Sequence, residues 1–295
     1  MNLDRLKHFC TIVETQNLRK AADLLHITPG ALSKSMQILR DEVGLELLTT
    51  EGRRLLITDE GQNFYIQCKK IVNDVDNLKR KTLAPAARTK LRIATFEPFT
   101  VYFLTQTIAK YFANDCCYIL QRLPGEMEQA LLMREVDLGI TYAPIPHPEL
   151  EFLEVCSIQK KIFARAGVFD GVEFAKIPFA APITPVPQSP SGISNFDGWP
   201  SDIPRNLVFE IEILEATLEL CRLGLAAVFT YDYVVRIQNE MLQNSFKLKA
   251  LAFPKGMSEL KRPVYIIKRR VDAESPALKK LARALRQICG TSSSD

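Results

Sequence analysis

The sequence has few of the residues on which most enzymes and metal proteins depend. Its 295 residues include only three histidines, and it contains neither a glycine-rich phosphate loop nor a G-x-S-x-G motif. The seven cysteines are odd in number and form no C-x-x-C pair, which argues against a disulfide framework and a zinc site. We therefore expect no catalytic residues, no metal and no cofactor. Whether any cysteine is redox-active stays open.

Long uncharged apolar runs are also missing. No stretch of about 18 such residues occurs, so we expect no membrane contact. The N-terminal sequence MNLDRLKHFC has charged and polar residues where a secretory signal needs an apolar segment, and we expect a cytoplasmic protein. The length favours about two domains, and the 47% hydrophobic content supports a sizeable buried core.

Charge of one sign is scarce as well. The formal net charge is +4, and residues 1–85 hold 13 Lys and Arg against 11 Asp and Glu, a net of +2. So nearly balanced a charge does not by itself indicate a nucleic-acid binder. Any such function has to be argued from the arrangement of residues.

Three short helices are predicted near the N-terminus. Leu6, Phe9, Cys10 and Val13 have the spacing of an amphipathic helix, with Asp4 in its first turn or at its N-cap. Asn17 is a second N-cap, and Ala21-Ala22 provide the small residues that two crossing helices need. Thr28 caps a third helix, roughly 29–43, with Pro29 at its first position and Gly44 after its end.

The third helix has two distinct faces. Leu32, Met36 and Leu39 recur at helical spacing and should point inward. Short polar groups with Lys and Gln remain on the outer face near the N-terminal half, which suits reading of the DNA major groove. These candidate DNA-binding residues are Thr28, Pro29, Ser33, Lys34 and Gln37. Taken singly, such residues more often cap or solvate a helix.

A β-hairpin is predicted after this helix. Two apolar stretches, 45–48 and 55–58, flank Glu51-Gly52-Arg53-Arg54. Arg53 and Arg54 at the tip suit phosphates or the minor groove. On their own, two such arginines fit an ordinary solvated turn equally well.

From Leu6 to Gly61 the sequence resembles the DNA-binding domain of LysR-type transcriptional regulators. The resemblance rests on Ala21–Leu25, on TPGALSK from Thr28 to Lys34, on Gly44–Leu47, and on Gly52–Arg54 followed by Leu56–Gly61. It implies major-groove contacts by Thr28, Pro29, Ser33 and Lys34, and minor-groove entry by Arg53. The sequence departs from the family at two places. Pro29-Gly30 stands where the family often has Gln-Pro, which affects base preference. Leu47-Leu48-Thr49-Thr50 stands where the family tends to have Leu-Phe-x-Arg, which affects one phosphate contact.

A linker helix is expected after the hairpin. Apolar residues alternate in steps of four and three and form a seam that suits helix pairing; its members are Phe64, Cys68, Ile71, Val75 and Leu78. The alternative is a helix packed on its own domain. The resemblance favours a dimer or tetramer that binds an interrupted palindrome of double-stranded DNA.

The remaining two-thirds of the chain alternate short apolar strands with helices, which indicates an α/β domain. We expect strands at 91–95, 117–122, 136–141, 207–211 and 265–268, and helices at 99–112, 126–133, 214–223 and 276–288. This part resembles the two-lobed effector domain of LysR-type proteins, which is built like periplasmic solute-binding proteins. The run 224–229 resembles the family's glycine turn into a further buried strand. The expected organisation is a winged helix-turn-helix over 1–58, a linker helix and hinge over 59–88, and an effector domain over 89–295, with lobe I about 89–161 and 265–295 and lobe II about 162–264.

An effector is expected between the lobes, at the carboxyl ends of strands. The lining candidates follow three predicted strands: Thr95, Phe96, Glu97 and Thr100; Thr141 and Tyr142; Thr230 and Tyr231. The expected function is DNA-binding transcriptional regulation modulated by a small-molecule effector. Other hypotheses are an enzyme, a free solute-binding protein, and a regulator that no longer responds to a ligand. The sequence does not indicate the effector, the operator or the sign of regulation.

Overall fold

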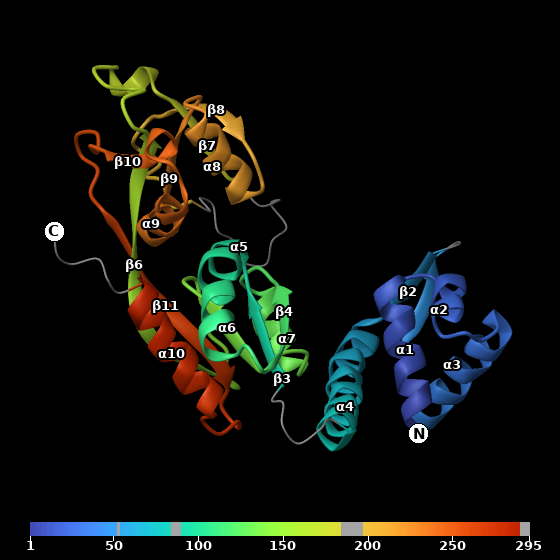
Figure 1. Ribbon diagram of the computed structural model, residues 1–295. Coiled ribbons are helices and arrows are strands. Elements are labelled where there is room, and N and C mark those ends of the chain that lie inside the picture. The colour runs from blue at the N-terminus through green and yellow to red at the C-terminus, as the bar shows by residue number, and fades with distance from the viewer. Residues whose placement is uncertain (52–53, 84–89, 184–196, 290–295) are drawn as a thin grey trace. The chain divides into compact units, whose positions relative to one another are not determined.

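The computed structural model describes residues 1–51, 54–83, 90–183 and 197–289. The chain divides into two compact units (Figure 1). Each has its own hydrophobic core. The first comprises Met1–Arg88 and Ala130–Val136, and the second comprises Thr89–Gln129 and Asp137–Asp295.

Three helices begin where the sequence supplies capping side chains. They are α1 (Leu3–Thr15), α2 (Leu18–Leu24) and α3 (Pro29–Val43). The Asn17 side chain accepts a hydrogen bond from the Lys20 amide, and Thr28 Oγ1 accepts one from the Ala31 amide at 3.1 Å. Asn2 caps α1, so Asp4 lies in the first turn. Gly44 ends α3 in the left-handed region, with φ of +74°.

Small residues let these helices approach one another. Ala21 and Ala22 are fully buried and pack with Ile12 and Leu32 in one cluster. A second cluster behind it contains Phe9 and Leu39. The apolar side of α3 is thus fixed to α1 and α2, and its polar side is left on the surface.

The first strand of the hairpin lies later in the chain than the sequence pattern indicated. Strand β1 spans Leu48–Glu51 and pairs with β2 (Arg54–Ile57), with Glu51 opposite Arg54. The predicted strand over 45–48 was therefore wrong by about three residues. Leu47 is buried in the core, and its carbonyl accepts from the Thr58 amide at 3.2 Å, so its apolar side chain reflects core packing rather than the ladder.

The linker helix α4 (Asp59–Leu83) packs against the core of its own unit through one side. Cys68 and Val72 belong to the cluster around Phe9, whose ring centroid is 5.5 Å from that of Phe64. Cys68 is 2% exposed, so its prediction as a residue between two chains was wrong. Heptad spacing alone cannot tell an intramolecular face from an intermolecular one.

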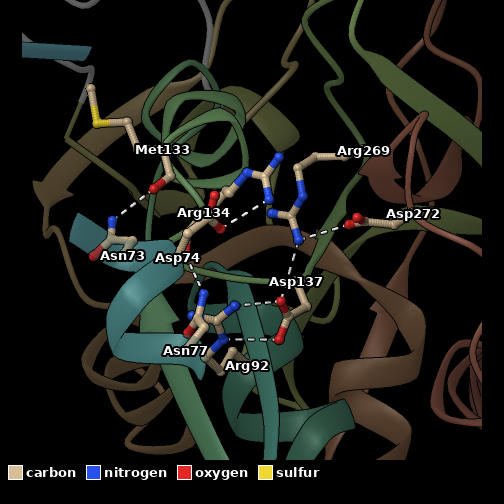
Figure 2. A network of polar contacts seen from close by, with 9 residues as sticks. All are labelled: Asn73, Asp74, Asn77, Arg92, Met133, Arg134, Asp137, Arg269 and Asp272. Carbon is tan, nitrogen blue, oxygen red and sulfur yellow. Dashed lines mark hydrogen bonds and ion pairs between the residues drawn. The ribbon is translucent and has the colours of Figure 1, made fainter. Parts of the chain in front are cut away.

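Polar contacts in the first unit join α4 to the segment 130–136 (Figure 2). The Asn73 side-chain amide donates to the Met133 carbonyl at 2.7 Å, and Arg134 pairs with Asp74 at 2.9 Å. Arg134 has a φ of +58°, an uncommon conformation for a residue with a side chain. These contacts help to hold that conformation.

The second unit is built on one twisted sheet with the strand order β4-β3-β5-β11-β6-β9-β7-β8, and β10 pairs with β6. β3, β4 and β5 are parallel, whereas β11 and β6 run antiparallel to their neighbours. The strands are β3 (Lys90–Thr95), β4 (Cys116–Gln121), β5 (Leu138–Thr141), β6 (Leu150–Arg165), β7 (Pro178–Ala181), β8 (Asn206–Glu210), β9 (Ala227–Tyr231), β10 (Leu248–Leu251) and β11 (Leu260–Arg269).

Two lobes share this sheet. β6 and β11 run from one lobe to the other, as Figure 1 shows. The 16-residue β6 was not foreseen, because its mixed burial pattern lacks a regular alternation. Lobe I includes α6 (Thr105–Tyr111), the start of α7 (Glu126–Leu132) and α10 (Pro276–Cys289), and lobe II includes α8 (Leu214–Arg222) and α9 (Asp232–Met241).

The helix expected over 99–112 is interrupted. A short α5 (Glu97–Phe99) leads into a π-helical turn, η1 (Thr100–Leu104), before α6. Such turns inside helices are often found at functional sites. Hydrophobic periodicity gives no signal for the extra residue, since η1 still buries Tyr102, Phe103 and Leu104.

Lobe I is fixed by one shared carboxylate. Asp137 precedes β5 and accepts from Arg92 Nε on β3 at 2.9 Å and from Arg269 on β11 at 3.3 Å (Figure 2). Arg269 also pairs with Asp272 at 2.7 Å. Arg92 and Arg269 are largely buried, whereas the Asp137 side chain is 39% exposed. This network thus links three strands through charge-assisted hydrogen bonds from two buried guanidinium groups to one partly exposed carboxylate.

Candidate nucleic-acid interface and effector site

The outer face of α3 is an open polar surface. Ser33, Lys34 and Gln37 are exposed, as are Thr28 and Pro29 at the start of the helix, whereas Leu32 and Leu39 are fully buried. All five predicted residues therefore lie on one accessible face. Thr28 also caps the helix through its hydroxyl, so it has a structural role whatever else it contacts.

Gly30 lies within this face and makes no packing contact. A Cβ placed on it would meet nothing within 4 Å. The missing side chain is therefore not required by the fold. It leaves backbone accessible at the N-terminal turn of α3, where amide groups can approach a phosphate or a base edge.

A second layer of polar contacts positions α3. His8 Nδ1 on α1 lies 2.8 Å from Ser35 Oγ on α3. Burial lowers the pKa of His8, although the nearby Asp4 carboxylate opposes that shift. Sequence reasoning missed Ser35, because it precedes Met36 on the side of the helix that faces α1.

The hairpin arginines can be placed only in part. Arg53 lies outside the described residues, and Arg54 begins β2 with a side chain that is also outside the description. Their contact with DNA stays a prediction.

Aromatic rings from both lobes meet at the carboxyl ends of β3, β5 and β9. The Tyr142 ring lies 4.9 Å from Phe96 and 5.2 Å from Tyr231, measured between centroids. Phe99 stacks on Tyr233 at 6.2 Å. Burial raises the pKa of Tyr142 and that of Tyr231, so both phenols stay neutral. Of the predicted effector residues, the structure brings Phe96, Tyr142 and Tyr231 together in this inter-lobe aromatic cluster.

The predicted threonines lie at the same strand ends, and three of them use their hydroxyls locally. Thr95 Oγ1 donates to the Ile140 carbonyl at 3.2 Å, and Thr141 Oγ1 accepts from the Ala143 amide at 3.0 Å. Thr100 Oγ1 donates to the Phe96 carbonyl, and Thr230 is buried in β9. Glu97 lies in α5, but its side chain is outside the described residues.

A buried lysine beside the aromatic cluster was missed. Lys160 on β6 is 5% exposed, and its Nζ donates to the Asp197 carbonyl at 2.6 Å. The same Nζ lies 4.5 Å from the centroid of the Tyr231 ring. Burial lowers the pKa of Lys160 to about 7, since the attraction of Asp197 does not offset the lost hydration. In the sequence, Gln159-Lys160-Lys161 looks like exposed strand surface.

A polar cluster also joins the lobes. The Tyr102 hydroxyl in η1 of lobe I donates to Glu215 on α8 of lobe II. Gln238 on α9 donates to the Tyr102 hydroxyl at 3.1 Å and to Glu215 Oε2 at 2.9 Å. Burial alone would raise the pKa of Glu215, but the hydrogen bonds from Tyr102, Gln238 and Arg222 outweigh it, and the pKa is lowered.

Within residues 1–51, 54–83, 90–183 and 197–289, no group of three or more His, Cys, Asp or Glu is placed to hold a metal ion. The helices described there are also too short or too polar to cross a membrane.

Two family profiles match the chain. "Bacterial regulatory helix-turn-helix protein, lysR family" matches residues 3–62, and "LysR substrate binding domain" matches residues 85–290. Among curated proteins, the glycine cleavage system transcriptional activator of Escherichia coli K12 is 28% identical over 140 residues, which are 48% of this chain and 46% of that protein. The match spans about half the length of this relative.

Solved structures of similar fold cover almost the whole chain. LysG of Corynebacterium glutamicum, with arginine bound as effector, gives a TM-score of 0.61 at 18% identity over 98% of each chain. CbnR complexed with its target DNA gives 0.62 at 16% identity, over 97% of this chain and 99% of that one. At these identities the similarity shows a shared fold.

Proposed function

The chain belongs to the LysR family of bacterial helix-turn-helix regulators, and on that premise we propose that it is a sequence-specific DNA-binding transcriptional regulator controlled by a small-molecule effector. The observation that carries the DNA-binding half is the two-faced α3, with Leu32 and Leu39 fully buried and Ser33, Lys34 and Gln37 exposed. A helix fixed through its apolar side and polar along the other is what entry into the major groove requires.

The effector site belongs between the lobes of the second unit. Phe96 and Tyr142 come from lobe I and Tyr231 from lobe II, so a molecule inserted among these rings would alter the contact between the lobes. A ligand shifts a conformational equilibrium by its difference in affinity for the two states. The structure of LysG contains bound arginine as its effector. The effector of this chain has to be found by experiment.

A second copy of the chain is the proposed partner along α4. Ile71 and Leu78 are 45% and 65% exposed, and Val75 between them is half-buried. These three residues, with Phe64 at one end, keep the helical spacing of an apolar stripe. Pairing would present two α3 helices to the half-sites of an interrupted palindrome. Because the proposed target is the chromosome, a cytoplasmic location is part of this proposal. The proposal also assigns the chain no enzymatic activity.

The first experiment is footprinting on the DNA that flanks the protein's own gene, with and without a panel of small metabolites. It reports the operator, the size of the bound oligomer and the response to ligands together. A protected interrupted palindrome supports the proposal. No protected site at moderate salt contradicts DNA-specific binding, and an unchanged footprint across the panel favours a regulator that no longer senses a ligand.

Substitutions on α3 then test the DNA-binding face. Lys34→Ala and Ser33→Ala should each weaken operator binding by about 1–3 kcal/mol, roughly 5- to 150-fold, if they contact bases. Affinity is measured by fluorescence anisotropy at several salt concentrations. The control is Lys249→Ala, an exposed lysine on β10 of the second unit. Equal affinities for Lys34→Ala and the control would contradict the assignment of the recognition helix.

A charge introduced into the exposed stripe of α4 tests the dimer. Leu78→Glu should shift sedimentation toward the monomer, because a carboxylate cannot be buried in an apolar seam without a partner. Gln62→Glu introduces the same side chain at an exposed position of the same helix and should leave the assembly unchanged. If both variants sediment like the parent, the α4 stripe is not the interface.

A further inference from the structure

Two cysteines far apart in sequence meet beside one cavity of the second unit. Cys156 lies on β6 and is half-buried, and Cys289 is the last residue of α10 and is buried. The cavity has a volume of about 310 Å³. Its lining consists of Cys156, Ser157, Ile158, Gln159, Lys261, Arg286 and Cys289. Both thiols are therefore next to a space that a small reactant can enter.

The pair lies at an irregularity in the strand that joins the lobes. Val264 of β11 is opposite Cys156, whereas the next residue, Tyr265, is opposite Glu154. Val155 is thus an extra residue in β6, as in a β-bulge. Its carbonyl accepts from Arg286 Nε on α10 at 3.1 Å. Bulges re-aim side chains and are common near functional sites, and this one places Cys156 beside the end of α10.

The two thiols differ in proton affinity. The neighbouring Cys289 thiol lowers the pKa of Cys156, and the Arg286 charge lowers it further, against the effects of burial and of Glu154. The nearness of Cys156, together with burial, raises the pKa of Cys289. The more accessible sulfur is therefore the better nucleophile, and the buried one keeps its proton. This is the division of roles between an attacking and a resolving cysteine.

The other cysteines lack this combination of features. Burial raises the pKa of Cys10, of Cys68 and of Cys221 to about 12 in each case. Burial also raises the pKa of Cys117. Cys116 is exposed on β4, and it serves as a reference for ordinary thiol reactivity.

We propose that Cys156 and Cys289 form a thiol oxidation site for small hydroperoxides, in which Cys156 attacks and Cys289 resolves. Cys156 first releases its thiol proton to solvent, and the thiolate attacks one peroxide oxygen; an S–O bond forms, the O–O bond breaks, and the leaving alkoxide or hydroxide takes one proton back from solvent. Cys289 then attacks the sulfenic sulfur; the S–S bond forms, the S–O bond breaks, and the departing hydroxide takes the Cys289 proton to give water. Overall, two thiols and one hydroperoxide give one disulfide, one alcohol or water, and one water.

The charge of the lining favours an oxidant over a soft metal ion as the reactant. Lys261 and Arg286 both line the cavity, and two cations repel a third. Arg286 stabilises the thiolate, and a cation at this position also stabilises the developing oxyanion of the leaving group. The resulting disulfide would join the end of α10 to β6 at the junction between the lobes. This site goes beyond the proposed function, and its chemistry can be measured without DNA.

The test exposes the reduced full-length protein to one equivalent of hydrogen peroxide, followed by non-reducing peptide mass mapping. A cross-linked pair of peptides containing Cys156 and Cys289 is expected, together with loss of the Cys156 thiol at least about tenfold faster than loss of the Cys116 thiol. Cys289→Ser should trap sulfenic acid at Cys156, detected as a dimedone adduct, whereas Cys156→Ser should give no adduct at Cys289. Cys116→Ser is the control and should form the cross-link normally.

Three results would overturn the proposal. The first is equal rates for Cys156 and Cys116 with no internal cross-link in the wild-type protein. The second is a disulfide that joins Cys156 to another chain only. The third is tight binding of Cu(I) alone that depends on both cysteines while peroxide leaves them reduced. The cross-link between Cys156 and Cys289 is measured in the wild-type protein. A variant that fails to fold therefore does not affect whether the proposal is accepted.

Discussion

The recognition helix and the inter-lobe site treat their polar groups in opposite ways. On α3 the side chains of Ser33, Lys34 and Gln37 are exposed to solvent. Between the lobes, Lys160 donates to a carbonyl and Tyr102 donates to Glu215. The first surface is ready to meet an external partner, whereas Lys160 and Tyr102 in the second already donate hydrogen bonds within the protein.

This difference follows from the kind of partner each site meets. A long polyanion can bind a convex, preformed face without any rearrangement of the core. A small molecule between two lobes has to be enclosed, and it must replace contacts that the free protein already makes. Under the proposed function, an effector would have to replace the contacts among Phe96, Tyr142 and Tyr231.

The largest expected effect concerns the buried lysine. Its pKa falls from an ordinary 10.5 to about 7 in the folded protein. Between these values the native state binds fewer protons than the unfolded state, so the stability of the native state rises with pH in this window and is constant below it. Relative to Lys160→Met, the wild-type free energy of unfolding should rise by about 2–3 kcal/mol between about pH 7 and pH 9.

Urea unfolding of both proteins at several pH values measures this difference. Lys161→Met is the matched control, because Lys161 is the next residue on β6 and is half-buried rather than fully enclosed. The control should follow the wild-type pH dependence. Parallel curves for wild type and Lys160→Met would show that burial does not lower the pKa of Lys160. The contrast between the inter-lobe site and the exposed face of α3 would then be lost.

A smaller effect is expected at the polar cluster between the lobes. Tyr102→Phe keeps the buried ring and removes the hydrogen bond to Glu215. Because the Glu215 side chain is 45% exposed, water replaces part of the lost interaction, and the expected loss of stability is about 1.5 kcal/mol, the lower end for a bond to a charged group. The measurement is chemical unfolding of the full chain.

Tyr111→Phe provides the comparison for that variant. The Tyr111 hydroxyl donates to Gln287 at 2.8 Å in an exposed position within lobe I. Its loss should change stability by no more than about 0.5 kcal/mol. Equal effects of the two substitutions would mean that the cluster adds nothing to lobe contact.

The same contrast explains which parts of the molecule the sequence predicts. Capping by Asn17 and Thr28 and the buried Ala21-Ala22 pair depend on residues a few positions apart, and local patterns record such relationships. Lys160 and Asp197 meet only after β6 has crossed both lobes. No local pattern distinguishes that lysine from its neighbour Lys161.

The cases that failed have the same origin. Cys68 has the heptad spacing of an intermolecular seam, but Phe9 and Phe64 lie next to it within one chain. Leu47 looks like a strand residue and is a core residue. In each case hydrophobic spacing gave the correct side of the element, and tertiary packing decided what that side contacts.

The smallest effect on stability is expected at Gly30 on the open face. Gly30→Ala adds a methyl group that meets nothing within 4 Å, and alanine favours the helix, so the free energy of unfolding should rise by about 0.5–1 kcal/mol. Operator affinity should nevertheless fall, because DNA that closely approaches the start of α3 would meet the new Cβ. Unfolding and anisotropy are measured on the same preparation.

Gly61→Ala is the control that separates an open surface from a filled one. A Cβ there would lie 2.0 Å from the Leu47 carbonyl oxygen, so this variant should lose stability through a clash inside the unit. Gly30→Ala should show the opposite sign in stability together with a loss of binding. If Gly30→Ala gains stability and binds the operator as tightly as the parent, the backbone at this turn is exposed to solvent in the complex as well, and the groove is read from Ser33 and Lys34 onward.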